Sequence, residues 1–126
     1  KVRLWTLDGT LHNTLTGQEE MASCVAFSPD GEFIASSGNL NQIKVWKRDG
    51  RLLTILAEND ASVNHVAFNP DGQLVASCSG DSTIKLWNYN YTTGLSSQSI
   101  KTFVGHDGVV SKIAWSSDSQ FFASSG

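Results

Sequence analysis

Residues 24–31 read CVAFSPDG, and residues 65–72 repeat this stretch as HVAFNPDG. A looser third copy, KIAWSSDS, occupies residues 112–119. The first and second copies begin 41 residues apart, and the second and third begin 47 residues apart. In each copy a run of strand-forming residues leads into turn-forming residues. A stretch that recurs at nearly fixed spacing predicts a repeated structural unit.

A second marker keeps the same period. Residues 43–46 (IKVW) match residues 84–87 (IKLW) and residues 2–5 (VRLW), so that the tryptophans are 41 residues apart in both intervals. The six extra residues of the longer interval fall around 89–99, between two expected strands. A surface loop tolerates such an insertion at little cost in free energy.

Each period contains four short runs of strand-forming residues bounded by turns, and no segment shows a helical period. The sequence therefore predicts an all-β chain. The expected strands are 2–6, 10–15, 22–28, 32–37, 42–47, 51–56, 62–68, 73–78, 83–88, 98–104, 109–115 and 120–125.

Composition argues against several classes of function. The net charge of −3 supplies no basic stripe for nucleic acid, and no apolar run approaches the roughly 18 residues of a membrane span. The two cysteines, Cys24 and Cys78, lie inside apolar strands without zinc-ligand spacing, which favours a reducing, cytoplasmic setting. No phosphate-binding loop or metal motif is present, so we expect no cofactor.

A period near 41 residues, with a tryptophan ending each third strand and Gly-His at 105–106 before a first strand, resembles the WD40-repeat family. The resemblance covers essentially the whole chain and is closest to the regular arrays common in bacteria. It implies a β-propeller segment of four-stranded antiparallel blades. Residues 1–17 form the second half of a blade, 18–57 and 58–104 form full blades, and 105–126 form the first half of another.

The resemblance also implies a buried hydrogen-bond network of His, Ser or Thr, Asp and Trp within each blade. Gln18 and Asn59 stand where two histidines are expected, and Leu40 replaces an aspartate. No blade therefore carries the full set within its own residues. The network residues present are Ser36, Trp46, Ser77, Asp81, Trp87, His106, Ser124 and Trp5.

In the family, one face of the propeller is lined by residues at the start of each first strand and in the second turn of each blade. This mapping predicts an uncharged partner-binding face, suited to a protein loop or peptide held by hydrogen bonds and modest apolar contact. Plain loop residues are the alternative interpretation of the same set. The residues are Met21, Ser23, Asn39, Ser62, Asn64, Gly80, Val109 and Ser111.

The function expected from the resemblance is a non-enzymatic protein-interaction scaffold. An alternative is a regulatory or sensor module of a larger bacterial signalling or effector protein. An enzyme would need His106 as a base, Asp107 to orient it, and Ser111 or Ser124 as nucleophile. Adjacent His and Asp side chains rarely point at each other, so a structural role for His106 is favoured.

The two ends of the sequence align at one point of the repeat, the turn between second and third strands. The closing half-blade is therefore complementary to the opening half-blade. Two interpretations follow: the blades continue in a longer chain, or copies of the chain associate. Two associated copies would form a six-bladed ring, within the usual range of four to eight blades.

Overall fold

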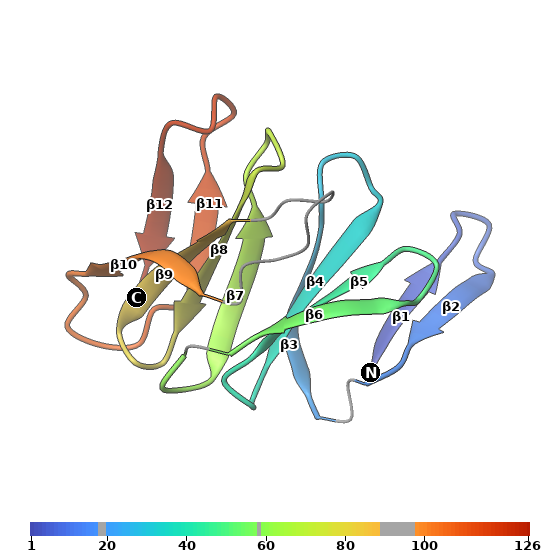
Figure 1. Cartoon of the computed structure of the whole chain (residues 1–126), viewed down its shortest axis with the longest axis horizontal. Coiled ribbons are helices and arrows are strands. Elements are labelled where there is room, and N and C mark those ends of the chain that lie inside the picture. Colours follow the sequence, from blue (N-terminus) through green and yellow to red (C-terminus); the bar gives the residue numbers. More distant parts are fainter. Residues whose placement is uncertain (18–19, 58, 89–97) are drawn as a thin grey trace.

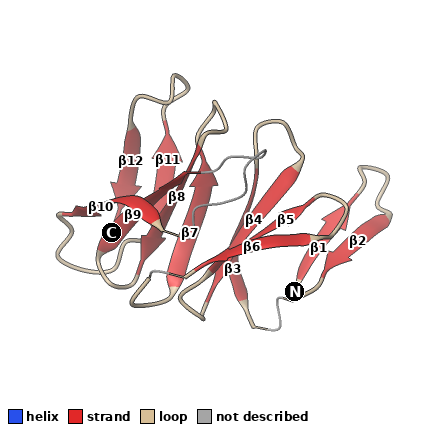
Figure 2. Cartoon of the chain, in the orientation of Figure 1, coloured by secondary structure: helices blue, strands red, loops and turns tan. Residues whose placement is uncertain are grey.

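The computed structural model describes residues 1–17, 20–57, 59–88 and 98–126. Every regular element in these residues is a β-strand (Figure 2), which confirms the predicted fold class. No helix long and apolar enough to span a membrane occurs among them. The expected insertion around 89–99 falls largely outside the described residues.

The strands form four antiparallel sheets in which neighbours in sequence are neighbours in space (Figure 1). The N-terminal pair consists of β1 (Val2–Trp5) and β2 (Leu11–Leu15). The first full sheet consists of β3 (Ala22–Phe27), β4 (Phe33–Gly38), β5 (Ile43–Lys47) and β6 (Leu52–Leu56). The second full sheet consists of β7 (Val63–Phe68), β8 (Leu74–Ser79), β9 (Thr83–Asn88) and β10 (Ser99–Val104), and the C-terminal pair consists of β11 (Lys112–Trp115) and β12 (Phe122–Ser125).

One strand begins later than the sequence predicts. The expected strand at 109–115 starts at Lys112, whereas the other strand ends lie within two residues of expectation. The reason is that the backbone before β11 bonds to the neighbouring sheet: the Val110 amide donates to the Ser79 carbonyl over 3.2 Å. Pairing with β12 begins only beyond that link.

The repeated turns explain why the period is visible in the sequence. Gly31 and Gly72 adopt positive φ angles of 72° and 75° in the two Pro-Asp-Gly turns, a conformation that glycine adopts without steric cost. In the third copy Ser119 occupies this position with φ of 59°. The turn geometry is therefore kept where the glycine is lost.

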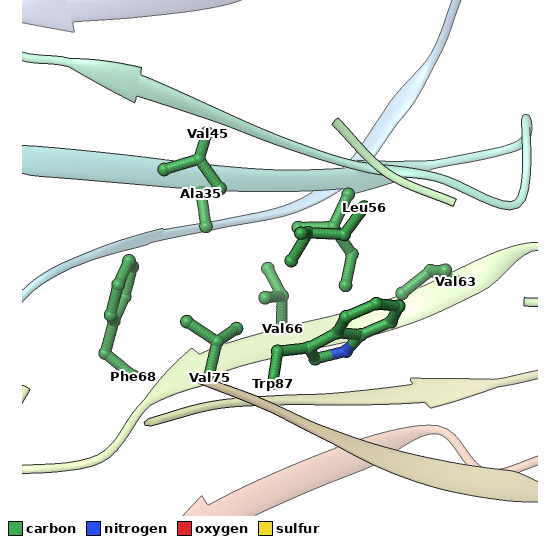
Figure 3. Close-up of a cluster of buried hydrophobic side chains, with 9 residues drawn as sticks. Ala35, Val45, Leu56, Val63, Val66, Phe68, Val75 and Trp87 are labelled. Atoms are coloured by element: carbon green, nitrogen blue, oxygen red, sulfur yellow. The ribbon is translucent and has the colours of Figure 1, made fainter. Parts of the chain in front are cut away.

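The core lies between the faces of neighbouring sheets rather than inside any one sheet. Its largest cluster joins the first and second full sheets, and similar clusters join these sheets to the two terminal pairs. Trp46 and Trp87, at the ends of equivalent strands, are completely buried. The side chains of the largest cluster (Figure 3) are Ala35, Ile43, Val45, Leu56, Val63, Val66, Phe68, Val75 and Trp87.

The sheets stand side by side in an open row, with the N-terminal pair at one end and the C-terminal pair at the other (Figure 1). β1 pairs only with β2, and β12 pairs only with β11. Trp5, on β1 at the N-terminal end of the row, is 59% exposed. Its exposure follows from the missing neighbour along the outer edge of β1.

Candidate partner-binding face

The eight residues predicted to bind a partner lie on one side of the row. They lie at the start of β3 and β7, in the segments that enter β3, β7 and β11, and in the turns between β4 and β5 and between β8 and β9, all on the lower side in Figure 1. The fold brings these segments together because each connection returns the chain to the same edge of its sheet.

Three apolar side chains project from this side. Met21 and Val109 are each more than half exposed, and Asn39 is also exposed. Leu40 beside Asn39 is likewise more than half exposed, although the sequence analysis treated it only as a replacement for a network aspartate. An unexpected apolar residue in a tight turn was the signal that could have identified it. We call Met21, Asn39, Leu40 and Val109 the partner face.

Ser23 and Asn64, at the same position of successive repeats, hold neighbouring sheets together. The Ser23 hydroxyl donates to the Val63 carbonyl over 2.9 Å, and the Asn64 side-chain amide donates to the Val110 carbonyl over 2.9 Å. Each bond joins the first strand of one sheet to the first strand, or the segment entering it, of the next. Because their side chains bond to the next sheet, Ser23 and Asn64 have fewer hydrogen-bonding groups left to contact a ligand.

Ser111 occupies the third of these repeat positions and is exposed. Its amide donates to the Ser125 carbonyl over 2.7 Å, but its hydroxyl has no hydrogen-bond partner among the residues that the structure describes. Ser62 and Gly80 are half-buried, with the Gly80 amide donating to the Ser62 carbonyl over 3.0 Å. This bond holds the turn between β8 and β9 against the segment that enters β7.

The turns beneath the face share an unusual backbone conformation. Asn41 and Ser82, at equivalent repeat positions, have positive φ angles of 56° and 71°. Non-glycine residues adopt such angles at a cost, and they concentrate at functional sites. Asn41 also accepts a bond through its carbonyl from the Asn59 side-chain amide at 3.4 Å.

The buried network is present in part. The Trp87 indole donates to the Ser77 hydroxyl over 3.0 Å, and the His106 ring nitrogen Nε2 lies 2.8 Å from the Ser124 hydroxyl. Asn59, where histidine was expected, is buried and its side-chain oxygen has no partner among the described residues. The substitution therefore leaves one polar atom unsatisfied, as expected for an incomplete network.

The Asp81 carboxylate stabilises the turn between β8 and β9 and does not accept a hydrogen bond from the Trp87 indole. Its carboxylate accepts hydrogen bonds from the Thr83 amide and hydroxyl and from the Asp60 amide. Partial burial raises the pKa of Asp81, but the bonds from Thr83 and Asp60 outweigh burial, so that the pKa lies below its usual value. The carboxylate stays ionised and holds the turn.

The first full sheet departs from the predicted network. The Trp46 indole donates to the Thr16 carbonyl over 3.0 Å, and so does not donate to Ser36 as predicted. Thr16 lies in the connection from the N-terminal pair, which the local repeat does not reveal. Gln18, which stands at the expected histidine position, lies outside the described residues, and the exposed Trp5 side chain makes no hydrogen bond to any residue that the structure describes.

A buried ion pair near this connection was not predicted. The Lys44 ammonium lies 2.7 Å from the Glu20 carboxylate and donates to the Gly17 carbonyl over 2.6 Å. The Lys44 side chain is only 8% exposed. The signal was a lysine between two apolar residues of a strand in the buried part of the repeat. Its charge is neutralised in place by the Glu20 carboxylate.

His106, Asp107 and Ser124 do not form a Ser-His-Asp triad in the described part of the chain. His106 contacts Ser124, yet no carboxylate in the described part of the chain bonds to the His106 ring, and the exposed Asp107 does not orient it. No group of three or more His, Cys, Asp or Glu residues among the described residues is placed to hold a metal ion. This side of the chain carries three exposed apolar residues, Met21, Leu40 and Val109, and the exposed carboxylates of Asp60 and Asp107 lie in the connecting segments on the same side.

A comparison with known protein families identifies the same repeat. The family model described as WD domain, G-beta repeat, matches residues 9–47, 50–88 and 97–126. No curated protein sequence matches the chain. The three matched segments together cover most of the sequence and follow the period on which the strands recur.

Proposed function

The chain belongs to the WD40 repeat family, whose repeats generally mediate protein–protein interaction, and from this premise we propose that it is a non-enzymatic scaffold. We place its binding surface at the partner face. The observation that carries this proposal is the exposure of Met21, Leu40 and Val109 on one side of the row. Exposed apolar side chains on that side favour a ligand with apolar groups.

The chemistry of the surface indicates the kind of ligand. The partner face contains no charged residue, and the exposed Asp60 and Asp107 lie in the connecting segments on the same side. Backbone amides and carbonyls of the surrounding turns supply hydrogen-bonding groups. An uncharged peptide or protein loop fits this chemistry. The net charge of −3 also supports a protein partner over a nucleic acid.

We also propose that the protein works in a reducing, cytoplasmic setting. The free thiols of Cys24 and Cys78 support this proposal. A bacterial origin stays a prediction from the regularity of the repeat.

A displayed library of random peptides, selected on the immobilised full chain, tests the scaffold proposal. Selected peptides should carry apolar residues and little net charge. Their affinity should fall roughly tenfold or more in the variant Met21→Glu/Val109→Glu, since a loss of about 1.4 kcal/mol corresponds to a factor of ten. Asn64 is left unchanged because its side chain joins two sheets.

A matched control is Leu7→Glu, which places the same charge on a fully exposed apolar residue in the turn between β1 and β2. That turn lies on the opposite side of the row (Figure 1). Peptide affinity should be unchanged in this variant. Selected peptides that bind the face variant as well as the wild type would contradict the proposal.

A further inference from the structure

We propose that the outer edge of β6 binds an extended segment of a partner protein, which adds to the first full sheet as a fifth strand. This inference goes beyond the proposed function, because the partner face lies at the starts of the first strands and in the turns after the second strands. The segment that fits the edge runs antiparallel to β6, is apolar, and carries an acidic residue near its C-terminal end.

The edge belongs to the last strand of a complete four-stranded sheet. β6 pairs with β5 on one side, and no strand of the described residues pairs with its other side (Figure 1). An edge of this kind is a template for another strand, because an extended chain satisfies the outward-pointing amides and carbonyls in turn. The backbone therefore specifies a strand as the occupant.

The chain supplies its own comparison, since β2 and β10 are also the last strands of their sheets. The three strands align residue by residue through a register shift that occurs at the same position in each. The extra residue at this shift is His12 in β2, Leu53 in β6 and Ile100 in β10. Differences between the three edges are therefore differences in side chains.

β6 is the most apolar of the three strands at its exposed positions. Leu52, Leu53 and Ile55 are 39%, 37% and 39% exposed. Neither of the other strands keeps apolar residues at all three positions. The polar residues at the equivalent positions are His12 and Thr14 in β2, and Ser99 and Thr102 in β10.

A charged residue marks β10 but not β6. Lys101 of β10 is exposed, and its ammonium lies 5.1 Å from the centroid of the Phe103 ring. The equivalent residue of β6 is Thr54. Charged side chains, lysine above all, protect edge strands against pairing with another chain. β6 contains no charged residue, so its edge lacks this protection.

The strand is held in place from its inner side. Leu56 is completely buried in the largest core cluster, together with Ile43 of β5 and Val63 of β7. At its other end Leu52 lies against the connection at Gly17, where an added Cβ would be 3.7 Å from the Leu52 side chain. A partner segment would therefore meet an edge that is already ordered, which lowers the entropy cost of binding.

The exposed side chains of β6 favour an apolar segment. Residues directly opposite each other on neighbouring antiparallel strands have side chains in contact on the same face of the sheet. Ile55 has such a neighbour, Lys44, on the β5 side, and a residue of the added strand would contact it from the other side. Aromatic and β-branched residues gain most from such pairs.

The charges at the start of β6 indicate the direction of the segment. This end of the strand carries two cations, Lys47 and Arg51, against one carboxylate, Asp49. Arg51 is exposed, and its guanidinium makes no ion pair with any residue that the structure describes. Neighbouring strands of this sheet are all antiparallel, so an added strand in the same sense ends near Arg51. An acidic residue there complements the guanidinium.

Binding of a synthetic peptide to the full chain tests the site. The probe is a short fluorescein-labelled peptide of alternating valine and threonine that ends in glutamate, and its binding is followed by fluorescence anisotropy. Leu53→Lys gives β6 a charge of the kind that β10 carries and should weaken binding roughly tenfold. The matched control is Ile100→Lys, at the equivalent position of β10, which should leave the affinity unchanged.

A second variant guards against an effect on folding. Ile55→Thr introduces the residue that β2 and β10 carry at the equivalent position, where the same fold accommodates it. The affinity for the peptide should fall about two- to fivefold, as expected for the loss of one apolar cross-strand pair. Urea unfolding of both β6 variants checks that the chain is still folded.

Backbone methylation of the peptide tests strand pairing itself. In an antiparallel pair alternate amides point toward the neighbouring strand and the others point away. Of two peptides methylated on either alternate set of amides, one should lose binding and the other should keep it. The glutamate peptide should also bind about twofold more tightly than its glutamine counterpart, and Arg51→Gln should remove this difference.

Four results would overturn the inference. These are unchanged affinity in Leu53→Lys, equal binding of the two methylated peptides, self-association of the chain that Leu53→Lys abolishes, and loss of the probe's binding in Met21→Glu/Val109→Glu. The last result would assign the probe to the partner face and leave the scaffold proposal standing. Conversely, library-selected peptides that ignore Met21→Glu/Val109→Glu would contradict the scaffold proposal alone, provided that the probe still depends on Leu53.

Discussion

The buried ion pair between Lys44 and Glu20 allows a prediction whose size follows from its burial. At 2.7 Å the gross attraction is about 6 kcal/mol for an effective dielectric constant of about 20. Most of this offsets the cost of removing both charges from water, so that the net contribution of the intact pair is small. Removing one partner is different, because it leaves the other charge buried without compensation.

Glu20→Gln should lower the free energy of unfolding by about 3 kcal/mol, the lower end of the range of roughly 3–5 kcal/mol for breaking a buried pair. The lower end applies because the Lys44 ammonium keeps its bond to the Gly17 carbonyl. Replacing both partners, as Lys44→Met/Glu20→Gln, should return stability to within about 1 kcal/mol of the wild type, since no buried charge remains.

Urea unfolding at one fixed protein concentration provides the measurement, followed by the fluorescence of the buried Trp46 and Trp87. The matched control is Glu32→Gln, which breaks the exposed pair with Arg48 at 3.1 Å. Exposed pairs contribute at most about 1 kcal/mol. Equal losses in Glu20→Gln and Glu32→Gln, or a double variant as unstable as Glu20→Gln, would refute the reasoning.

Three further predictions concern single residues. Asn64→Ala should cost about 1–2 kcal/mol in urea unfolding because the Val110 carbonyl loses its donor, whereas Asn64→Ser should cost less because serine makes this bond at position 23. Ser82→Gly should stabilise the chain by about 0.5–1 kcal/mol, since glycine adopts the φ of 71° without strain; a fall in thermal midpoint would contradict this. Burial, and secondarily Lys112, lowers the pKa of His65 from 6.5. The stability held above pH 6.5 should therefore fall as the pH drops through the folded-state pKa, since the unfolded chain binds the proton more readily. The fall should be smaller in His65→Gln, and an unchanged pH profile in that variant would count against the assignment.

The features that sequence analysis predicted correctly are those encoded within one repeat. Strand runs, the Pro-Asp-Gly turns and the 41-residue spacing depend on short-range backbone preferences, which is why most strand ends were placed closely. The family resemblance placed Ser77 and Trp87 in one network, and a hydrogen bond joins them across neighbouring strands of one sheet. The late start of β11 was not, because the Val110 amide bonds to another sheet.

The partner face was predicted only in outline. Its side of the fold followed from the repeat, but the exposure of Leu40 and the inter-sheet bond of Asn64 did not. A residue at the start of a first strand looks like a surface residue when its own repeat is considered alone. Whether its side chain faces solvent or the next sheet depends on how neighbouring sheets are rotated against each other.

The repeat and the all-β composition could be predicted from the sequence alone, because strand and turn preferences act over a few residues and recur each period. The bond from Trp46 to Thr16, the pairing of Lys44 with Glu20 and the exposure of Trp5 became known only from the fold. These outcomes depend on contacts between sheets and connections far apart in the chain. No periodic pattern within a single repeat specifies them.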